Sequence, residues 1–453
     1  MIEIELGGSL LMQGIEKALG KKILISHDMQ TALVLWEQLY RNQPPWVSES
    51  VKSLSLPTTI AGELACQATL DFTLELSGSS RADMIHKQVF EKLVFDLRRC
   101  VEQACAYGGI VFKPYLDKRR LAVEYVPAQR FFPLATDSRG RIVSAVFAEQ
   151  IKRNHRIYTR LEEHVLEPDG VRVRNLAFEG NGLLGPGRPV SLSCLPEWEM
   201  LAEEVTLKGA ERPLFAYLKM PLLNTVDMDS PLGISVFARA VDLMKEADLQ
   251  FSRLLWEYEG GELAVDASVD ALLLEGGDMK MPNLNKRLFR ALDVEMEHGD
   301  LYSVFAPALR DASYLNGLNE VLIRIEDLCG LARGTISNMN YTARTATELN
   351  LLRQRSYATV TDIQKSLQAA MLELADALDM MTTVFSLAPA GKYTLTFEFD
   401  DSVVTDRASQ FEEMKFLAER GIINKWEFRS WYLGETEQQA KEKLSEIEVS
   451  VVS

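Results

Sequence analysis

The sequence predicts an α+β fold in which helical and β-rich stretches occupy separate parts of the chain. Three observations indicate this class. Residues 1–107 carry mainly helical patterns, residues 108–229 carry short alternating and β-branched runs, and the part that follows contains three long amphipathic helices. A chain of 453 residues, 47% of them apolar, is long enough for two or three domains.

The pattern of residues in the first half of the chain changes from helical to β-rich near residue 108. Before it, helical patterns are punctuated by prolines, and the last helix of this part ends at the pair Gly108-Gly109. After it come runs such as GIVFKPY and VRVRNLAF, separated by the turn signals DSRG and EPDG. Residues 1–107 therefore predict a helical part, and residues 108–229 predict a β-rich one.

The next two helices each carry an apolar seam in steps of three and four residues. The first is predicted for residues 230–259, with Ser230 as its N-cap and Pro231 at the first helical position. Asp248 interrupts its seam once. The second is predicted for residues 309–333. The seam positions are Phe237, Val241, Met244, Phe251, Leu255 and Tyr258 in the first helix, and Leu315, Leu318, Leu322, Ile325, Cys329 and Ala332 in the second. Such seams are typical of helices packed side by side at a shallow angle.

The remaining segments follow from turn and capping signals. Residues 260–308, between the two helices, predict short strands and turns, and residues 334–344 predict a polar loop. Thr345 and Glu348 form a capping box that opens a helix over residues 345–388. The second half of that helix has an apolar stripe at Val360, Ile363, Leu367, Ala370, Leu374, Leu378 and Met381. Residues 389–453 predict an alternating strand (Tyr393, Leu395, Phe397, Phe399) and three short helices.

Composition excludes several classes of protein. The net charge of −16 argues against a binder that reads nucleic-acid sequence, although not against a conduit that a nucleic acid slides through. Five cysteines without a C-x-x-C motif indicate neither a disulfide framework nor a structural zinc site, so a reducing compartment fits best. The start of the chain lacks the pattern of a signal peptide, and no apolar run approaches the ~20 residues that span a bilayer. We expect a soluble protein, made in the cytoplasm, without a membrane partner.

No motif predicts a catalytic residue, a cofactor or a metal site. GLARGTIS lacks the lysine of a phosphate-binding loop, GLLGPGRP contains a proline, and G-x-S-x-G does not occur. His155 and His164 with Glu162 and Glu163 could suggest a metal cluster, but their strand-like, charged run favours a solvated sheet face. The helical pair Cys100 and Cys105 is predicted to be buried core thiols rather than a reactive pair.

The order of these parts resembles that of the portal, or head–tail connector, proteins of long-tailed bacteriophages. TATELNLLRQRSYATVTDIQKSLQ is similar to the segment that follows the channel loop in that family. ALRDASYLNGLNEVLIRIEDLCGLARGTIS resembles the preceding stem helix and its glycine exit. AYGGIVFKPY and RFFPLATDSRGRIVSAVF resemble the β-rich wing, and FDDSVVTDRASQFEEMKFLAERGIINKWEFRSWYLGETEQQAKEKL resembles the C-terminal region. Together these stretches cover most of the chain beyond about residue 30.

The resemblance implies a portal fold and a ring of about twelve copies at one vertex of a viral capsid. Residues 1–107 and 108–229 would form the wing, residues 230–259 and 309–333 the stem, and residues 260–308 the clip. Residues 334–344 would be the channel loop, and residues 345–388 a helix that leads from the wing to the crown, formed with residues 389–453. Implied partners are double-stranded DNA, the terminase large subunit, a head-completion or adaptor protein, and the major capsid and scaffolding proteins. The protein would reside in the virion, and in the host cytoplasm during assembly.

Three sets of residues are candidates for these contacts. For the channel they are Ser337, Asn338, Asn340, Tyr341, Arg344, Arg353 and Arg355. For partner docking at the clip they are Lys280, Lys286, Arg287 and Arg290. For packing between subunits they are the stem residues Phe237, Val241, Met244, Phe251, Leu255, Leu315, Leu318, Leu322 and Ile325. An acidic channel would hold DNA weakly, and a few cations would guide it.

Alternative interpretations of these residues and of the function remain. Arg353 and Arg355 could belong to a solvated helix face or form ion pairs along the helix. The stem seams could be core within one chain rather than contacts between copies. The alternative functions are a DNA-processing enzyme of a packaging machine and a cytoplasmic helical scaffold or adaptor.

Overall fold

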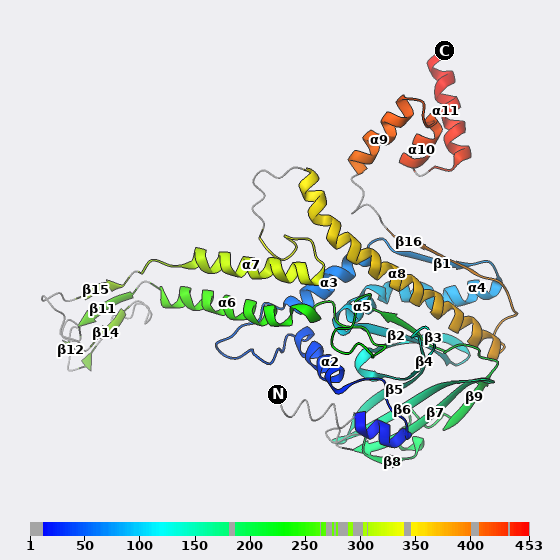
Figure 1. Ribbon diagram of the computed structural model, residues 1–453, viewed down its shortest axis with the longest axis horizontal. Coiled ribbons are helices and arrows are strands. Elements are labelled where there is room, and N and C mark those ends of the chain that lie inside the picture. The colour runs from blue at the N-terminus through cyan, green and yellow to red at the C-terminus, as the bar shows by residue number, and fades with distance from the viewer. Residues whose placement is uncertain are drawn as a thin grey trace. The chain divides into compact units, whose positions relative to one another are not determined.

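The computed structural model describes most of the chain (Figure 1). The described residues are 12–180, 186–262, 264–268, 274–275, 278–279, 289–292, 302–305, 307–338, 346–399, 407–433 and 435–452. The chain divides into a large unit, residues 1–69 and 75–395, and a small one, residues 70–74 and 396–453. Helix and sheet occupy separate stretches, which confirms the predicted mixed fold class.

We keep the names wing, stem, clip and channel loop for the residue ranges given above, as labels of chain segments only. The helices of residues 1–107 pack around a common apolar core. They are α2 (His27–Tyr40), α3 (Leu56–Ala68), α4 (Ser80–Ile85), a π-helical turn (His86–Phe90) and α5 (Glu91–Tyr107). Ser26 caps α2, because its hydroxyl accepts the amide of Met29 at 3.2 Å. One side of α5, at Leu97, Val101 and Ala104, is fully buried. The two cysteines of α5 are also buried, as predicted, and burial raises the pKa of Cys100 to about 12.

Two antiparallel sheets follow α5. The smaller has the order β10-β2-β3, from β2 (Gly109–Asp117), β3 (Arg120–Pro127) and β10 (Ala216–Lys219). The larger has the order β4-β5-β6-β7-β8, and β9 also pairs with β7. Its strands are β4 (Phe131–Thr136), β5 (Ile142–Arg153), β6 (Arg156–Glu167), β7 (Gly170–Gly180), β8 (Arg188–Val190) and β9 (Glu204–Lys208). The β-rich part therefore consists of hairpins whose register follows the turns predicted from the sequence.

The charged run on β6 is buried, so the predicted solvated sheet face is wrong there. Glu163 and His164 are almost inaccessible, and the His164 Nε2 atom lies 2.8 Å from the Glu162 carboxylate. Lys113 donates to Glu162 at 2.7 Å. Burial opposes ionisation of Glu162, but Lys113, His164 and Arg160 hold its pKa well below the ordinary value. Lys113 and Arg160 thus balance the charge of Glu162 on one face of the sheet, and on the other face Glu163 pairs with Lys21 at 2.7 Å.

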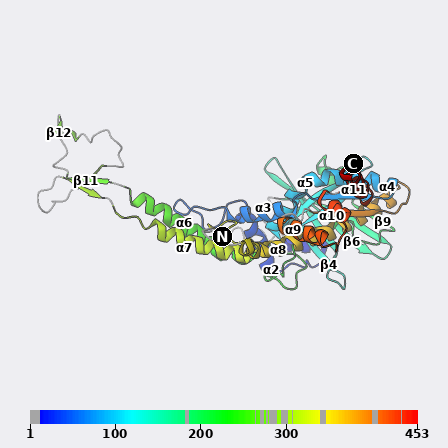
Figure 2. The same ribbon diagram turned by 90° about the horizontal axis from the view of Figure 1, so that it is seen from above.

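The two stem helices, α6 (Val241–Gly260) and α7 (Asp311–Cys329), lie side by side (Figures 1 and 2). The predicted start of the first helix at Ser230 and Pro231 is wrong, because residues 230–237 pack against the wing without forming a helix. The Pro231 carbonyl accepts the Lys219 ammonium at 2.8 Å, and Val236 donates its amide to the carbonyl of Cys105 at 2.9 Å. These long-range contacts outweigh the local capping signal.

Short strands connect α6 to α7. They form a three-stranded sheet in the order β14-β11-β15 and a two-stranded hairpin. The strands are β11 (Ala264–Ser268), β12 (Leu274–Glu275), β13 (Asp278–Met279), β14 (Phe289–Leu292) and β15 (Tyr302–Phe305). Strand β11 is central, parallel to β14 and antiparallel to β15.

Helix α8 (Ala346–Val384) has 39 residues, close to the predicted length. All seven positions of its predicted stripe are buried. It packs against α3, β2 and β10. Arg81 fixes its C-terminal end, through a 2.8 Å ion pair with Asp379 and hydrogen bonds to the carbonyls of Ala388 and Pro389. The predicted capping residue Thr345 lies outside the described residues.

The chain ends in β16 (Thr394–Glu398), which pairs with β1 (Thr73–Ser77), and in α9 (Arg407–Glu419), α10 (Lys425–Leu433) and α11 (Glu437–Val452). Side chains alternate between exposed and half-buried along β16, as predicted. Within the small unit, aromatic rings of α9 and α10 form a cluster. The ring centroid of Phe411 lies 5.6 Å from that of Phe428 and 5.2 Å from that of Tyr432.

Candidate functional site

The stem seam divides into a covered half near the wing and an open half near the clip. Four of the predicted packing residues are buried within their own chain: Phe237, Met244, Leu318 and Ile325. Val241, Phe251 and Leu322 are half-buried. Leu255 and Leu315 stay 36% and 46% exposed. The prediction that neighbouring copies cover the whole seam is therefore wrong for the covered half, where the chain covers itself.

Asp248, which interrupts the seam, anchors a distant segment to α6. Its carboxylate accepts the indole N–H of Trp46 and the amide of Leu54, each at 2.8 Å. One turn further, Ser252 accepts the amide of Lys52 at 2.8 Å. We call residues 43–55 the strap. Burial raises the pKa of Asp248. The interruption thus marks the place where the strap binds the stem.

A second carboxylate joins the two stem helices at their clip end. Glu257 of α6 is buried and accepts the amide of Arg310 at 3.0 Å and its guanidinium at 2.7 and 3.1 Å. Hydrogen bonds from Arg310 hold the pKa of Glu257 below its ordinary value. Near this clamp several apolar side chains are open to solvent. They are Leu255, Trp256, Tyr258, Leu309 and Leu315.

The base of the channel loop folds around Glu326 of α7. This side chain is 0% exposed. Its carboxylate accepts the amides of Gly334 at 3.1 Å, Ile336 at 2.6 Å and Ser337 at 2.9 Å, and the Ser337 hydroxyl at 2.7 Å. Ser337, expected to face the channel, is thus buried in the subunit, because its side chain completes this cage of donors.

The adjacent Asp327 ties both flanks of the loop to α7. Arg333, just before the loop, donates two hydrogen bonds to it at 2.9 and 3.0 Å. Arg355 of α8, after the loop, lies 3.4 Å away, and Arg324 also approaches. Hydrogen bonds from Arg333 hold the pKa of Asp327 below its ordinary value. Arg355 is exposed, but its charge is paired within the chain.

The other candidates are placed less completely. Asn338 is exposed, and its amide donates to the Asn319 side chain at 2.6 Å. Arg290 lies on β14, opposite Asp266 of β11. The structure gives no side-chain position for Arg353, and Asn340, Tyr341, Arg344, Lys280, Lys286 and Arg287 lie outside the described residues.

Sequence reasoning missed the four acids that organise this region, Asp248, Glu257, Glu326 and Asp327. A signal existed for two of them. Asp248 breaks an apolar seam, and Glu326 sits beside Ile325 on the apolar side of a helix, where a charge needs partners. The identity of those partners could not be read from the sequence, because they come from other segments.

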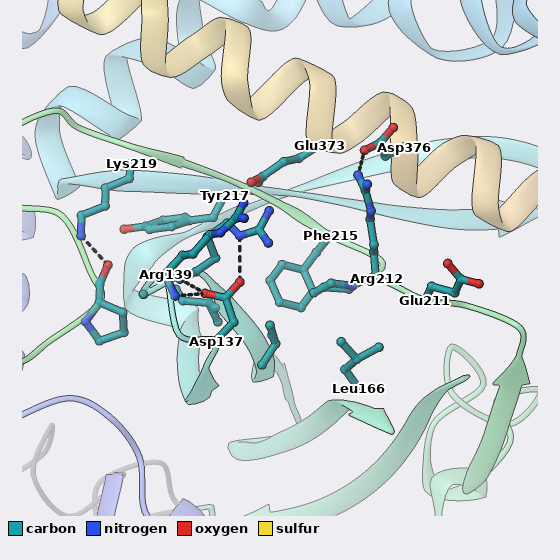
Figure 3. A pocket seen from close by; sticks show the side chains of 16 residues that line it. Asp137, Arg139, Leu166, Glu211, Arg212, Phe215, Tyr217, Lys219, Glu373 and Asp376 are labelled. Carbon is teal, nitrogen blue, oxygen red and sulfur yellow. Dashed lines mark hydrogen bonds and ion pairs between the residues drawn. The ribbon is translucent and has the colours of Figure 1, made fainter. Parts of the chain in front are cut away.

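A cavity of about 480 Å³ lies between the turn joining β4 and β5, the segment leading into β10, and α8 (Figure 3). Four acidic and four basic residues line it: Asp137, Glu211, Glu373, Asp376, Arg139, Arg141, Arg212 and Lys219. Several of these charges satisfy one another. Asp137 accepts from Arg141 at 2.9 Å, and Asp376 pairs with Arg212. The lining has no excess of either charge that would select an ionic ligand.

Among the described residues, no three His, Cys, Asp or Glu side chains come together in a way that could hold a metal ion. None of the helices that the structure describes combines the length and the apolarity needed to cross a bilayer.

Comparison with known proteins identifies the family. No curated protein matches this chain. A chain of the virion of a native gene transfer agent particle is similar, with 11% identity and a TM-score of 0.45 over 95% of this chain and 99% of that one. A chain of the neck of such a particle, computed with C12 symmetry, shows 10% identity and a TM-score of 0.42 over 92% and 97%. The family described as phage portal protein, SPP1 Gp6-like, matches residues 90–451. Because this match spans most of the chain, the protein belongs to the SPP1 Gp6-like family of phage portal proteins, which form the channel at one vertex of the capsid.

Proposed function

We propose that about twelve copies of this chain close into a ring whose channel carries double-stranded DNA into the capsid during packaging and out during ejection. The ring is a conduit and a docking platform, and it catalyses no reaction itself. Membership of the portal family supports this proposal. The net charge of −16 supports it as well, because a strongly basic channel would bind the phosphates and hold the duplex.

The observation that carries the proposal is the open half of the stem. Both helices leave apolar side chains uncovered there, Leu255 and Trp256 on α6 and Leu315 on α7. In a ring each subunit contacts its two neighbours through two different surfaces. Uncovered apolar groups on two different helices supply such surfaces, and their burial between copies is favourable at about 25 cal/mol per Å².

The channel and clip residues have separate tasks in this proposal. Asn338, Asn340, Tyr341, Arg344, Arg353 and Arg355 face the passing DNA or the neighbouring loop, with Arg355 partly neutralised by Asp327. Lys280, Lys286, Arg287 and Arg290 dock the terminase large subunit and later the head-completion or adaptor protein. The major capsid and scaffolding proteins contact the outside of the ring.

Native mass spectrometry and negative-stain electron microscopy of the purified protein test the ring. We expect a closed assembly of about twelve subunits, and a protein that stays monomeric or dimeric at high concentration contradicts the proposal. The purified ring should hydrolyse neither ATP nor DNA with Mg²⁺ present. Deleting residues 338–341 should leave the ring intact and reduce DNA packaging by a terminase. Loss of the ring would instead assign those residues a role in assembly.

A further inference from the structure

We infer that Glu326 is the positioning residue of the channel loop, and that with Asp327 it fixes the base of the loop to stem helix α7. The inference rests on the proposed function, since it assigns to these residues the height at which the loop meets DNA. It concerns the described base of the loop, residues 334–338, and the two flanking arginines.

Four donors surround the carboxylate of Glu326. Three backbone amides and one hydroxyl, all from residues 334–337, donate to Glu326 at 2.6–3.1 Å. Hydrogen bonds to a buried charge are about twice as strong as neutral ones. No cation forms an ion pair with Glu326 among the residues that the structure describes. The backbone of the loop base therefore provides the stabilisation of this charge, and it must keep its conformation for the charge to stay satisfied.

Asp327 binds residues on both sides of the loop. Arg333 precedes the loop and Arg355 follows it, and both guanidinium groups reach this one carboxylate. The end of α7 also lies against α8, because a Cβ atom at Gly330 would come within 2.3 Å of the Thr359 hydroxyl. Gly330 has a φ of +73°, which glycine adopts readily. The segment that enters the loop and the helix that follows it, α8, therefore both contact the end of α7.

These contacts have one mechanical consequence. A shift of α7 carries the loop base with it, because the donors of residues 334–337 bind Glu326 of that helix. Conversely, force on the loop is transmitted to the last turn of α7. Glu326 is therefore the residue through which stem and loop are coupled.

The test is Glu326→Gln in the full-length ring. Glutamine keeps the shape but turns one acceptor into a donor that faces the Gly334 amide and the Ser337 hydroxyl. We expect native mass spectrometry to find the ring intact. Hydrogen exchange followed by mass spectrometry should show the amides of residues 334, 336 and 337 exchanging roughly 10- to 100-fold faster. Terminase-driven DNA packaging should fall.

The matched control is Glu320→Gln, an exposed glutamate on the same helix that undergoes the same change of charge. It should alter neither exchange nor packaging. Ser337→Ala removes one of the donors without placing a mismatched group in the cage, so it keeps the test usable if Glu326→Gln does not fold. We expect it to speed exchange less.

If the amides of residues 334, 336 and 337 exchange at the wild-type rate in both Glu326→Gln and Ser337→Ala, then Glu326 does not anchor the loop base. Faster exchange with packaging equal to that of Glu320→Gln would overturn its positioning role. Failure of the wild-type ring to transmit DNA would count against the proposed function instead, while the exchange measurement would still decide whether Glu326 holds the loop base.

Discussion

The two halves of the stem are made of the same two helices but differ in what covers their apolar side chains. Near the wing, Met244, Leu318 and Ile325 are buried by their own chain, and the strap adds a polar anchor at Asp248. Near the clip, Leu255 and Leu315 continue the same seams but remain exposed close to the Glu257–Arg310 clamp. One sequence pattern therefore stabilises the subunit in one half of the stem and leaves apolar side chains available for assembly in the other.

The largest effect on the stability of the subunit is expected in the covered half. Ile325→Ala removes a fully buried side chain and should lower the free energy of unfolding by about 2–5 kcal/mol, because it leaves a cavity in the core. Urea titration of the dilute subunit, followed by circular dichroism, measures the change. Leu315→Ala is the control in the open half and should change the free energy of unfolding by less than about 1 kcal/mol. Equal losses would show that the two halves do not differ.

The strap should contribute the next largest effect. Asp248→Ala leaves the Trp46 indole and the Leu54 amide without their acceptor, so we expect a loss of about 2–3 kcal/mol in the free energy of unfolding. Trp46 fluorescence and limited proteolysis within residues 43–55 should both report release of the strap. Ser252→Ala, which loses only the bond from Lys52, should lose about 1 kcal/mol. A strap that stays protected in Asp248→Ala would mean that other contacts hold it.

The open half should affect assembly with little effect on the subunit. Leu255→Ser combined with Leu315→Ser should change the free energy of unfolding by less than about 1 kcal/mol, because both side chains are already in contact with solvent. Native mass spectrometry should nevertheless find fewer closed rings. Asn316→Ser on α7, at an exposed polar side chain, is the control and should leave the ring unchanged. Rings as abundant in the double variant as in the wild type would remove the open half from the interface.

The smallest effect should come from pH, with opposite signs at two acids. Arg333 lowers the pKa of Asp327 in the folded state. The ionised carboxylate therefore contributes to stability above its unfolded pKa of about 3.9, and this contribution is lost as the pH falls through the lower folded pKa. The pKa of Asp248 is raised by burial, so its ionisation opposes folding as the pH rises through the raised value. The stability difference between wild type and Asp327→Asn should therefore vanish at low pH. Removal of Asp248 should flatten the pH dependence of the free energy of unfolding between the unfolded pKa of about 3.9 and the raised folded value. The reverse pattern would contradict both assignments.

Much of the architecture followed from periodicity and turn signals. The stripe of α8 was predicted residue by residue, the second stem helix was predicted to within a few residues, and the family match confirms the resemblance to portal proteins. The failures have a common origin. Ser230 and Pro231 form a sound local start signal, yet the segment packs against β10 and α5 instead. The channel role expected of Ser337 conflicts with its burial against Glu326, which is eleven residues earlier in the chain.

The sequence alone determined which stretches are helical, which side of each helix is apolar, and which family the chain joins. These are local properties, because the spacing of apolar side chains along a helix depends only on neighbouring residues. The tertiary structure decided which part of each seam is covered and which acids hold the strap, the stem and the loop base. Those outcomes depend on which distant segments arrive at a helix, and the free energy of a buried carboxylate is set by donors that the sequence around it does not reveal.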